Sequence, residues 1–426
     1  MDHTSKIKVT NVTKIFGQHP SQAIKLLREG KSKQEILEMA GMTVGVNQVN
    51  FDIRSGETFV IMGLSGSGKS TLVRMFNRLI DPTEGEIYID GEEIVGMNKE
   101  QLRDIRRKKV GMVFQKFGLF PHKNILKNVE FGLEVQGVPA KERTEKALNA
   151  LELVELASYK DRYPDQLSGG MQQRVGLARA LANDPDILLM DEAFSALDPL
   201  IRKDMQNELI RLQATMHKTI IFITHDLDEA LRIGDRIAIM KDGSMIQIGT
   251  AEEILLQPAN DYVRKFVEDV DLFKVLKASN IQERIHMFDI NLGAEKALQE
   301  MQALQQSHIF AMNSKKEFIG VITLAELTTA MKEGKPLETI LNRNLPSVKP
   351  ETLLVDLPDL VLNSKYPITV IDNKNNCTGI ITKERLLSAM SNNKDKLNHV
   401  ITISKKVEKA RSLIEPKITS IAKGAF

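Results

Sequence analysis

The sequence lacks the cysteine pairs that would indicate disulfide bonds and the long apolar runs that would indicate a membrane-spanning helix. Its 426 residues include a single cysteine, Cys377, and no tryptophan. One cysteine cannot form an internal disulfide, so a reducing cytosol is the expected location. No apolar run approaches the roughly 18 residues that a membrane-spanning helix needs, and no basic start followed by an apolar segment indicates a signal peptide. Any role at a membrane would therefore depend on another chain.

The chain also lacks an excess of charge of either sign. Lys and Arg total 58 and Asp and Glu total 56, so the formal net charge is +2. This balance indicates neither nucleic acid nor an anionic membrane as a partner. Hydrophobic residues make up 42% of the chain, which is ordinary for a globular protein and sufficient, at this length, for two or three domain cores.

The first specific signal is a glycine-rich stretch that reads Gly63-Leu64-Ser65-Gly66-Ser67-Gly68-Lys69-Ser70. It matches the pattern G-x-x-x-x-G-K-S and stands between an apolar strand and a helix-like pattern. Such a loop turns successive backbone N–H groups toward one point, where a di- or triphosphate fits. The strand before it and the helix after it disfavour the alternative, a glycine-rich turn without a ligand. The residues expected around the nucleotide are Gly63, Ser65, Gly66, Ser67, Gly68, Lys69, Ser70 and Thr71.

Two later strands end in polar residues. The strand 187–190 ends in Asp191 and Glu192, and the strand 219–224 ends on His225. The carboxyl ends of parallel strands are where α/β folds gather their ligands. Asp191 is therefore predicted to hold Mg²⁺ together with the Ser70 hydroxyl, and Glu192 to polarise the attacking water as a general base. An isolated acidic pair is more often a solvated strand end, but the glycine-rich loop at 63–70 favours the catalytic interpretation.

Three weaker candidates complete the set. Gln115 ends a strand over 109–114 and could ligate Mg²⁺ or orient water, although a lone glutamine is weak evidence. The stretch Leu167-Ser168-Gly169-Gly170-Met171-Gln172-Gln173-Arg174 opens a helix, and its N–H groups indicate a second phosphate contact. Phe16 is compatible both with stacking on an adenine and with a place in the core.

Taken in chain order, these segments resemble the ATPase subunits of ABC transporters over about the first 270 residues. GLSGSGKS, Gln115, LSGGMQQR, ILLMDE, SALD and His225 correspond to the Walker A, Q-loop, signature, Walker B, D-loop and H-switch motifs. The resemblance implies that Phe16 stacks on adenine and that Lys69 meets the β- and γ-phosphates of ATP. It also implies a dimer of two copies that closes on two ATP molecules and opens after hydrolysis.

The resemblance further assigns roles to residues and partners. Hydrolysis would involve Glu192, His225 and Gln115, and Mg²⁺ would be held by Ser70, Gln115 and Asp191. In the dimer, the partner copy's γ-phosphate would be contacted by Ser168, Gly169 and Gly170, with Asp198 of the D-loop nearby. The loop 116–123 would meet a polytopic permease. No nucleic acid is expected as a partner.

A helical insertion points to a narrower group within the ABC transporter ATPases. Residues 20–41 read as two short amphipathic helices, the second opened by the capping-box pattern Ser32 to Glu35. Phosphate chemistry does not require them, so we expect a role in subunit contact or regulation. Together with VIMGLSGSGKSTLVRMFNRLI and FGLFPH, the insertion is similar to the ATPases of glycine betaine/proline betaine importers.

This similarity implies a peripheral ATPase on the cytoplasmic face of the cell membrane. It would energise import of a quaternary ammonium solute through a permease that works with, or is linked to, a substrate-binding protein. The sequence does not choose between glycine betaine, proline betaine, carnitine and choline. The alternative is a soluble ABC-type ATPase acting on nucleic acid or the ribosome, but the chain has neither long coiled coils nor a second ATPase domain.

The C-terminal part contains an internal repeat. The segment 308–313 is matched by 367–372, and 320–323 is matched at the same offset by 379–382. Each copy reads helix, strand, turn, strand, helix, and neither would bury its sheet face alone, so the copies should pack together. The repeat resembles a tandem of cystathionine-β-synthase-type (CBS) domains, which bind adenine nucleotides or cyclic dinucleotides. A purely structural repeat is the alternative.

Two positions depart from the CBS pattern. Where the family often has an aspartate that reads ribose hydroxyls, this chain has Glu326 in the first copy and Arg385 in the second. The departures argue against AMP or ATP. Lys383, Arg385 and the basic residues of 393–426 leave room for an anionic ligand or for contact with an acidic membrane surface. Of the two, we favour cyclic di-AMP at the paired repeats of the dimer as an inhibitor, with ionic strength acting through the basic groups as a parallel input. The simpler interpretation of 393–426 is a solvated tail.

The expected architecture is therefore α/β, a P-loop ABC-type ATPase domain followed by an α+β tandem CBS module. Its parts are an ATPase domain at 1–272, with the insertion at 20–41 and a helical subdomain at about 115–182, a regulatory module at 273–392 with repeats at about 276–335 and 336–392, and a basic tail at 393–426.

Overall fold

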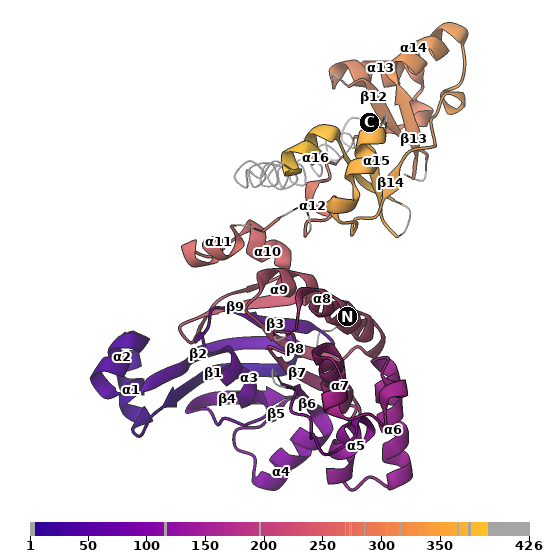
Figure 1. Cartoon of the computed structure of the whole chain (residues 1–426). Coiled ribbons are helices and arrows are strands. Elements are labelled where there is room, and N and C mark those ends of the chain that lie inside the picture. Colours follow the sequence, from indigo (N-terminus) through magenta and orange to yellow (C-terminus); the bar gives the residue numbers. More distant parts are fainter. Residues whose placement is uncertain are drawn as a thin grey trace. The chain divides into compact units, whose positions relative to one another are not determined.

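The computed structural model describes residues 5–390 except 115–116, 196, 269, 272, 274, 285, 305, 315–316, 365 and 374–375. Gln115 and the expected basic tail lie outside the described residues. The chain divides into two compact units, Met1–Val270 and Asp271–Phe426 (Figure 1), and each is described by itself.

The first unit is built on a six-stranded sheet with the strand order β10-β9-β3-β8-β7-β6. Its strands β6 to β9 and β3 run parallel, and β10 pairs antiparallel to β9. Every residue of β3, β7 and β8 is buried, as expected for parallel strands that are covered on both faces. The bounds are β3 (Thr58–Met62), β6 (Val110–Val113), β7 (Ile187–Asp191), β8 (Thr219–Thr224), β9 (Arg236–Lys241) and β10 (Ser244–Gly249).

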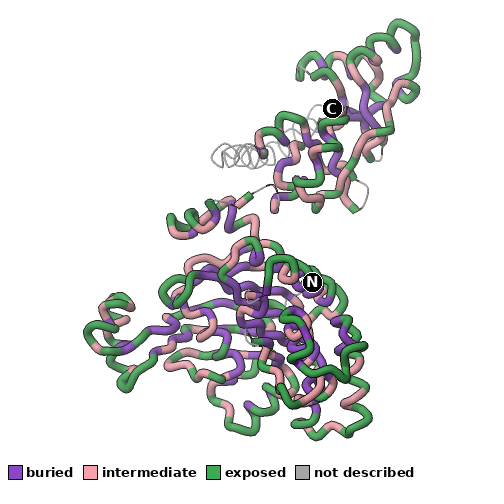
Figure 2. Tube along the Cα trace, viewed as in Figure 1, coloured by how far each residue is buried: buried purple, intermediate pink, exposed green. Residues whose placement is uncertain are grey.

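A second, antiparallel sheet has the order β2-β1-β4-β5. Apolar residues of β1 and β2 form one core with β3 and α3, for example Ile7, Ile53, Phe59 and Leu72. Figure 2 shows buried residues concentrated in the strands of this unit and exposed residues along its outer helices and loops. The bounds are β1 (Ser5–Phe16), β2 (Thr43–Arg54), β4 (Glu84–Ile89) and β5 (Glu92–Glu93).

Helices surround these sheets, and α5, α6 and α7 contact one another as a helical group between β6 and β7 in the chain. The bounds are α3 (Lys69–Phe76), α4 (Lys99–Asp104), α5 (Ile125–Val135), α6 (Ala140–Leu153), α7 (Gly169–Leu181), α8 (Pro199–Met216), α9 (Leu227–Ile233), α10 (Ala251–Leu256) and α11 (Asp261–Val267).

The insertion forms the helical hairpin that the sequence predicts, with α1 (Pro20–Arg28) and α2 (Lys33–Ala40) at one end of β1 and β2 (Figure 1). The predicted capping box is confirmed. The Ser32 hydroxyl accepts the Glu35 N–H at 3.2 Å, and the Glu35 carboxylate accepts the Ser32 N–H at 2.8 Å. The start of α2 is thereby fixed.

The second unit contains two three-stranded sheets, in the orders β11-β12-β13 and β14-β15-β16. In each sheet the first pair is parallel and the second antiparallel, which confirms the internal repeat. Phe310 and Val321 of the first copy share a cluster with Ile380 of the second, so the copies pack together as predicted. The bounds are β11 (Met287–Asp289), β12 (His308–Met312), β13 (Phe318–Thr323), β14 (Ser347–Val348), β15 (Ile368–Ile371), β16 (Cys377–Ile381), α12 (Ala278–Ile281), α13 (Ala294–Ala303), α14 (Leu324–Glu333), α15 (Pro358–Asn363) and α16 (Lys383–Met390).

The two residues that depart from the CBS pattern both have internal partners. The Glu326 carboxylate caps α14 by accepting the Thr323 N–H and hydroxyl at 2.9 and 2.7 Å. Arg385 forms an ion pair with Glu283. Within the described part of the chain, no helix has the length and apolar character required to cross a membrane.

Candidate nucleotide site

The glycine-rich loop runs from the end of β3 to the start of α3 and is packed tightly by neighbouring backbone. Gly63 and Gly68 have φ angles of +152° and +102°. A Cβ on Gly63 would lie 2.3 Å from the Met240 carbonyl oxygen, and one on Gly68 would lie 2.2 Å from that of Gly45. Glycine is required at both positions, since a side chain would push the loop away from β9 and β2.

Lys69 lies beneath this loop. Its Nζ donates to the Gly63 and Leu64 carbonyl oxygens at 2.8 and 3.0 Å. Burial lowers the pKa of Lys69, and the charges of Glu192 and Asp191 oppose that shift. A buried ammonium below a loop of N–H groups is suited to a polyphosphate.

The Ser67 hydroxyl gives an independent indication of a ligand. Its oxygen is buried and has no hydrogen-bond partner among the described residues. Buried polar atoms are normally paired, so an orphan in the loop fits a site that a polar ligand completes.

Two of the three predicted magnesium ligands, Ser70 and Asp191, meet at the carboxyl end of β7. Ser70 Oγ donates to Asp191 Oδ1 at 2.7 Å, and Arg74 Nη2 donates to Oδ2 at 3.0 Å. Asp191 is 4% exposed. A hydroxyl and a carboxylate in contact are the donor set that Mg²⁺ beside phosphates requires. Sequence analysis missed Arg74, although it stands four residues after Ser70 on the same helix face.

Glu192 and His225 lie beside each other at the ends of neighbouring strands. His225 Nδ1 is 3.9 Å from Glu192 Oε1. Glu192 has φ +47°, and the Ser195 hydroxyl donates to its carbonyl oxygen at 2.9 Å. A non-glycine residue in the left-handed region costs free energy, and such strain concentrates at functional sites. The arrangement offers a carboxylate and an imidazole next to the predicted phosphate site.

Phe16 stands at the rim of the loop, at the end of β1. Its ring is near Gly45, where a Cβ would lie 2.7 Å from the ring and 3.3 Å from Thr71 Cγ2. The Lys14 ammonium lies 5.2 Å from the ring centroid, and Phe16 is 40% exposed. The ring is therefore not a core residue and can stack on a base.

The remaining predicted residues form a second cluster at two helix starts. Ser168 caps α7 by accepting the Met171 N–H at 3.4 Å, and Asp198 caps α8 by accepting the Ile201 N–H at 3.1 Å. Gly170 packs so closely on Ile201 that a Cβ would lie 2.3 Å from it. Among the described residues, no hydrogen bond joins Ser168, Gly169 or Gly170 to the glycine-rich loop.

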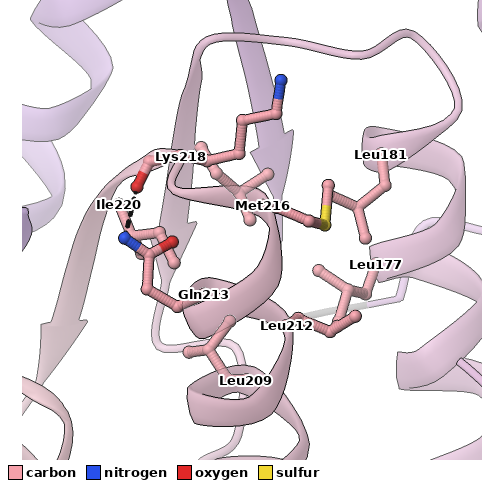
Figure 3. A pocket seen from close by; sticks show the side chains of 9 residues that line it. Leu177, Leu181, Leu209, Leu212, Gln213, Met216, Lys218 and Ile220 are labelled. Atoms are coloured by element: carbon pink, nitrogen blue, oxygen red, sulfur yellow. Dashed lines mark hydrogen bonds between the residues drawn. The ribbon is translucent and has the colours of Figure 1, made fainter. Parts of the chain in front are cut away.

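Farther along, α7 and α8 meet around a cavity of about 10 Å³ (Figure 3), room for about one water molecule. Leucines of both helices point toward each other there, so apolar packing joins the two elements. The lining residues are Leu177, Leu181, Leu188, Leu209, Leu212, Gln213, Met216, Lys218 and Ile220.

Comparison with known proteins extends these observations. The ABC transporter family model matches residues 46–195, and the CBS domain model matches residues 337–392. The glycine betaine transport ATP-binding protein of Bacillus subtilis is 57% identical over 393 residues, which cover 92% of this chain and 94% of that protein. The glycine betaine/carnitine transport ATP-binding protein of Listeria monocytogenes is 54% identical over 396 residues, covering 92% of this chain and all of that protein.

A solved structure is also similar, that of cbiO1 from Clostridium perfringens, part of the ABC transporter complex cbiONQ. It is 26% identical, with a TM-score of 0.50, and the match covers 62% of this chain and 96% of that one. The fold and the site motifs are thus those of the ATP-binding proteins of ABC transporters, which confirms the expected α/β fold with a C-terminal CBS domain. Within that class, the chain belongs to the family of glycine betaine transport ATP-binding proteins. These relatives give no support to the alternative ATPase acting on nucleic acid or the ribosome.

Proposed function

We propose that this chain hydrolyses ATP to energise import of a quaternary ammonium solute of the glycine betaine class. The observation that carries the proposal is the group formed by Lys69, Ser70 and Asp191 below the glycine-rich loop, with Glu192 beside it. The names of the relatives, which describe transport of glycine betaine and carnitine, support the solute class. Those names also describe ATP-binding proteins of transport systems, so we assign the transport path to a separate permease.

The residues have distinct roles in this proposal. Lys69 and the loop N–H groups bind the β- and γ-phosphates, and Phe16 stacks on the adenine. Ser70, Asp191 and Gln115 would hold Mg²⁺, which neutralises phosphate charge. Glu192 accepts the proton of the attacking water, and His225, 3.9 Å away, positions that carboxylate against the terminal phosphate.

A second copy of the chain completes the site in this proposal. Among the described residues, the hydrogen bonds and packing contacts of Ser168, Gly169, Gly170 and Asp198 are with α7, α8 and their neighbours rather than with the glycine-rich loop, so we assign these residues to the nucleotide of a partner copy. The dimer would contact a polytopic permease through 116–123, with a substrate-binding protein attached to it or working with it. The complex would lie on the cytoplasmic face of the cell membrane.

The C-terminal unit would regulate the ATPase, with cyclic di-AMP as the inhibitory ligand. The match of a CBS domain model to residues 337–392 supports a regulatory module. The basic groups there already have partners, because Arg385 pairs with Glu283 and Lys383 Nζ donates to the Leu362 carbonyl oxygen at 3.3 Å. The ligand's phosphates would compete with these contacts, which makes a change of conformation on binding part of the proposal.

The test is purification of the chain with its co-purifying membrane protein, followed by reconstitution in liposomes. ATP hydrolysis should rise on addition of one or more of glycine betaine, proline betaine, carnitine and choline, and the solute that stimulates it should accumulate. The Lys69→Ala variant should lose both activities. Copurification with nucleic acid, or hydrolysis that no such solute alters, would contradict the proposal.

A further inference from the structure

The helical hairpin α1–α2 is held firmly on the ATPase unit. Ala23 and Ile36 of the hairpin share a buried cluster with Ile15 of β1 and Val44 of β2. Ile15 and Val44 are themselves paired in the sheet, next to the pair Phe16 and Thr43. The hairpin therefore stands on the same strand ends that carry Phe16.

An ion pair and a helix cap fix its orientation further. Arg28 Nη2 lies 3.2 Å from the Glu84 carboxylate on β4. The capping box of Ser32 and Glu35 sets the direction in which α2 begins, and Lys33 is the first residue of that helix. Its side chain is therefore carried by an ordered element rather than by a loose loop.

Lys33 reaches the glycine-rich loop. Its Nζ donates to the Gly66 carbonyl oxygen at 3.1 Å, a contact between the insertion and the nucleotide site that sequence analysis did not anticipate. The same peptide group supplies the Ser67 N–H, which donates to the Leu64 carbonyl oxygen at 3.2 Å and closes a turn in the loop. A charged donor on the carbonyl of a peptide polarises its N–H, so Lys33 strengthens this turn.

The remaining supports of the loop come from elsewhere in the unit. Lys69 bonds to Gly63 and Leu64 from below, and the Gly243 N–H donates to the Ser67 carbonyl oxygen at 3.0 Å from the β9–β10 turn. Gly66 is exposed, and a Cβ there would meet nothing within 4 Å. Lys33 thus holds the outer, open side of the loop and adds a positive charge beside the predicted phosphate site.

We propose that Lys33 is a positioning residue of the nucleotide site, through which the hairpin tunes phosphate affinity. This inference rests on the proposed ATPase function and deepens it. Lys33 acts by holding the Leu64–Ser67 turn closed and by its charge, so its loss weakens the binding of ATP and ADP while the groups that act on the water stay in place. Loss of Lys33 should therefore raise KM and leave kcat nearly unchanged.

The test compares full-length variants by calorimetric titration with Mg²⁺ and a non-hydrolysable ATP analogue, and by steady-state hydrolysis. Lys33→Ala should raise Kd and KM about three- to tenfold, the value of one solvent-accessible charged hydrogen bond, with kcat changed less than about twofold. Lys33→Arg should restore most of the affinity, and Lys33→Glu should weaken binding more than Lys33→Ala. The loss should shrink at high salt, because screening weakens the charge.

Lys31→Ala is the matched control, because Lys31 pairs with Glu35 within the hairpin at 3.3 Å. This substitution should leave the nucleotide affinity within about twofold of wild type. Equal losses in Lys31→Ala and Lys33→Ala, or a Lys33→Ala variant with wild-type affinity, would overturn the inference. The Lys69→Ala variant distinguishes a failure of the inference about Lys33 from a failure of the proposed ATPase function. If the wild type itself binds no nucleotide, the ATPase assignment fails, whereas binding that Lys69→Ala abolishes and Lys33→Ala leaves unchanged rejects Lys33 alone.

Discussion

At the residue scale, the site depends on charges that are buried and balanced within a few ångströms. Asp191 divides its two oxygens between the Ser70 hydroxyl and the Arg74 guanidinium, so its charge is compensated although the side chain is almost fully buried. A buried carboxylate without such partners would be costly. Arg74 therefore orients the Asp191 carboxylate and balances its charge at the position predicted for a magnesium ligand.

Glu192 gives the sharpest test at this scale. Glu192→Gln should lower the rate of ATP hydrolysis by about 10²- to 10⁴-fold, the usual contribution of a general base, because an amide cannot accept the proton of water. Nucleotide affinity should stay near that of wild type, since Lys69 and Ser70 are unchanged, and ATP-bound dimers should accumulate in size-exclusion chromatography. Near-normal turnover would show that Glu192 is not the base.

Residues of the site could be predicted where their pattern is local in the sequence, but not where a contact joins segments that are distant in the chain. Lys69, Ser70, Asp191 and Glu192 were identifiable because each stands at a strand end or helix start whose local pattern is visible. The contact of Lys33 with Gly66 was not, because nothing in either segment encodes a link that the placement of the hairpin creates. The structure supplied that placement.

At the scale of elements, one buried ion-pair network connects α5 with α6. Glu130 is completely buried, accepts hydrogen bonds from Lys127 Nζ at 2.7 Å and Thr144 Oγ1 at 2.5 Å, and lies 3.7 Å from Arg143 Nε. Burial raises the pKa of Glu130, but Lys127, Thr144 and Arg143 outweigh it and hold the pKa below its ordinary value. The network therefore favours the ionised carboxylate in the folded state.

The pH dependence of this network has a definite sign. A glutamate whose pKa is lowered by folding stabilises the fold fully above its unfolded pKa of about 4.3, and the stabilisation is lost as the pH falls through the folded value. Glu130→Gln should lower the free energy of unfolding by about 1–3 kcal/mol at neutral pH. Urea titrations from about pH 7 down to about pH 3 should show a constant difference from wild type down to about pH 5 and a shrinking difference only below it. A difference that does not depend on pH would contradict the ionised network.

The contact of α7 with α8 is apolar, and Leu209 is its clearest test. Leu209 is 2% exposed and lines the small cavity between the helices. Leu209→Ala should destabilise the ATPase unit by about 2–5 kcal/mol, because it removes buried methyl groups and enlarges an existing void. Chemical denaturation would measure this, with the exposed Leu200→Ala on the same helix as the control, since Leu200 is 79% exposed. An equal effect of the two substitutions would show that the cavity side of α8 is not tightly packed.

The limits of elements were less predictable than their existence. Apolar residues continue at helical spacing as far as Val154 and Leu156, but α6 ends at Leu153 because Glu155 adopts φ +61°, which a helix cannot continue through. Alternation of apolar and polar residues covers only 7–12, but β1 spans Ser5–Phe16 and continues through irregularities in its pairing with β2. Both deviations come from backbone geometry, which side-chain patterns do not encode.

At the scale of the whole molecule, each of the two units has a hydrophobic core of its own. The core of the second unit includes residues of both strands β12 and β13, and a further cluster spans the two repeats. The ATP-site residues all lie in the first unit. This division predicts that the motor and the regulatory module can be separated by cutting the chain after Val270.

Removal of residues 271–426 therefore provides the test of regulation. The shortened chain, assembled with the permease, should hydrolyse ATP and transport at a rate near that of the full-length complex, because its nucleotide site and its core are intact. Its activity should no longer fall when cyclic di-AMP is added or when the salt concentration is lowered, since both inputs are assigned to the C-terminal unit. In the full-length complex, Lys383→Ala leaves the ATPase unit unaltered. The response that this substitution weakens, to cyclic di-AMP or to salt, is the one that uses the basic groups of the C-terminal unit. If the shortened complex keeps both responses, the sensor lies in the ATPase unit or the permease, and the repeat is structural.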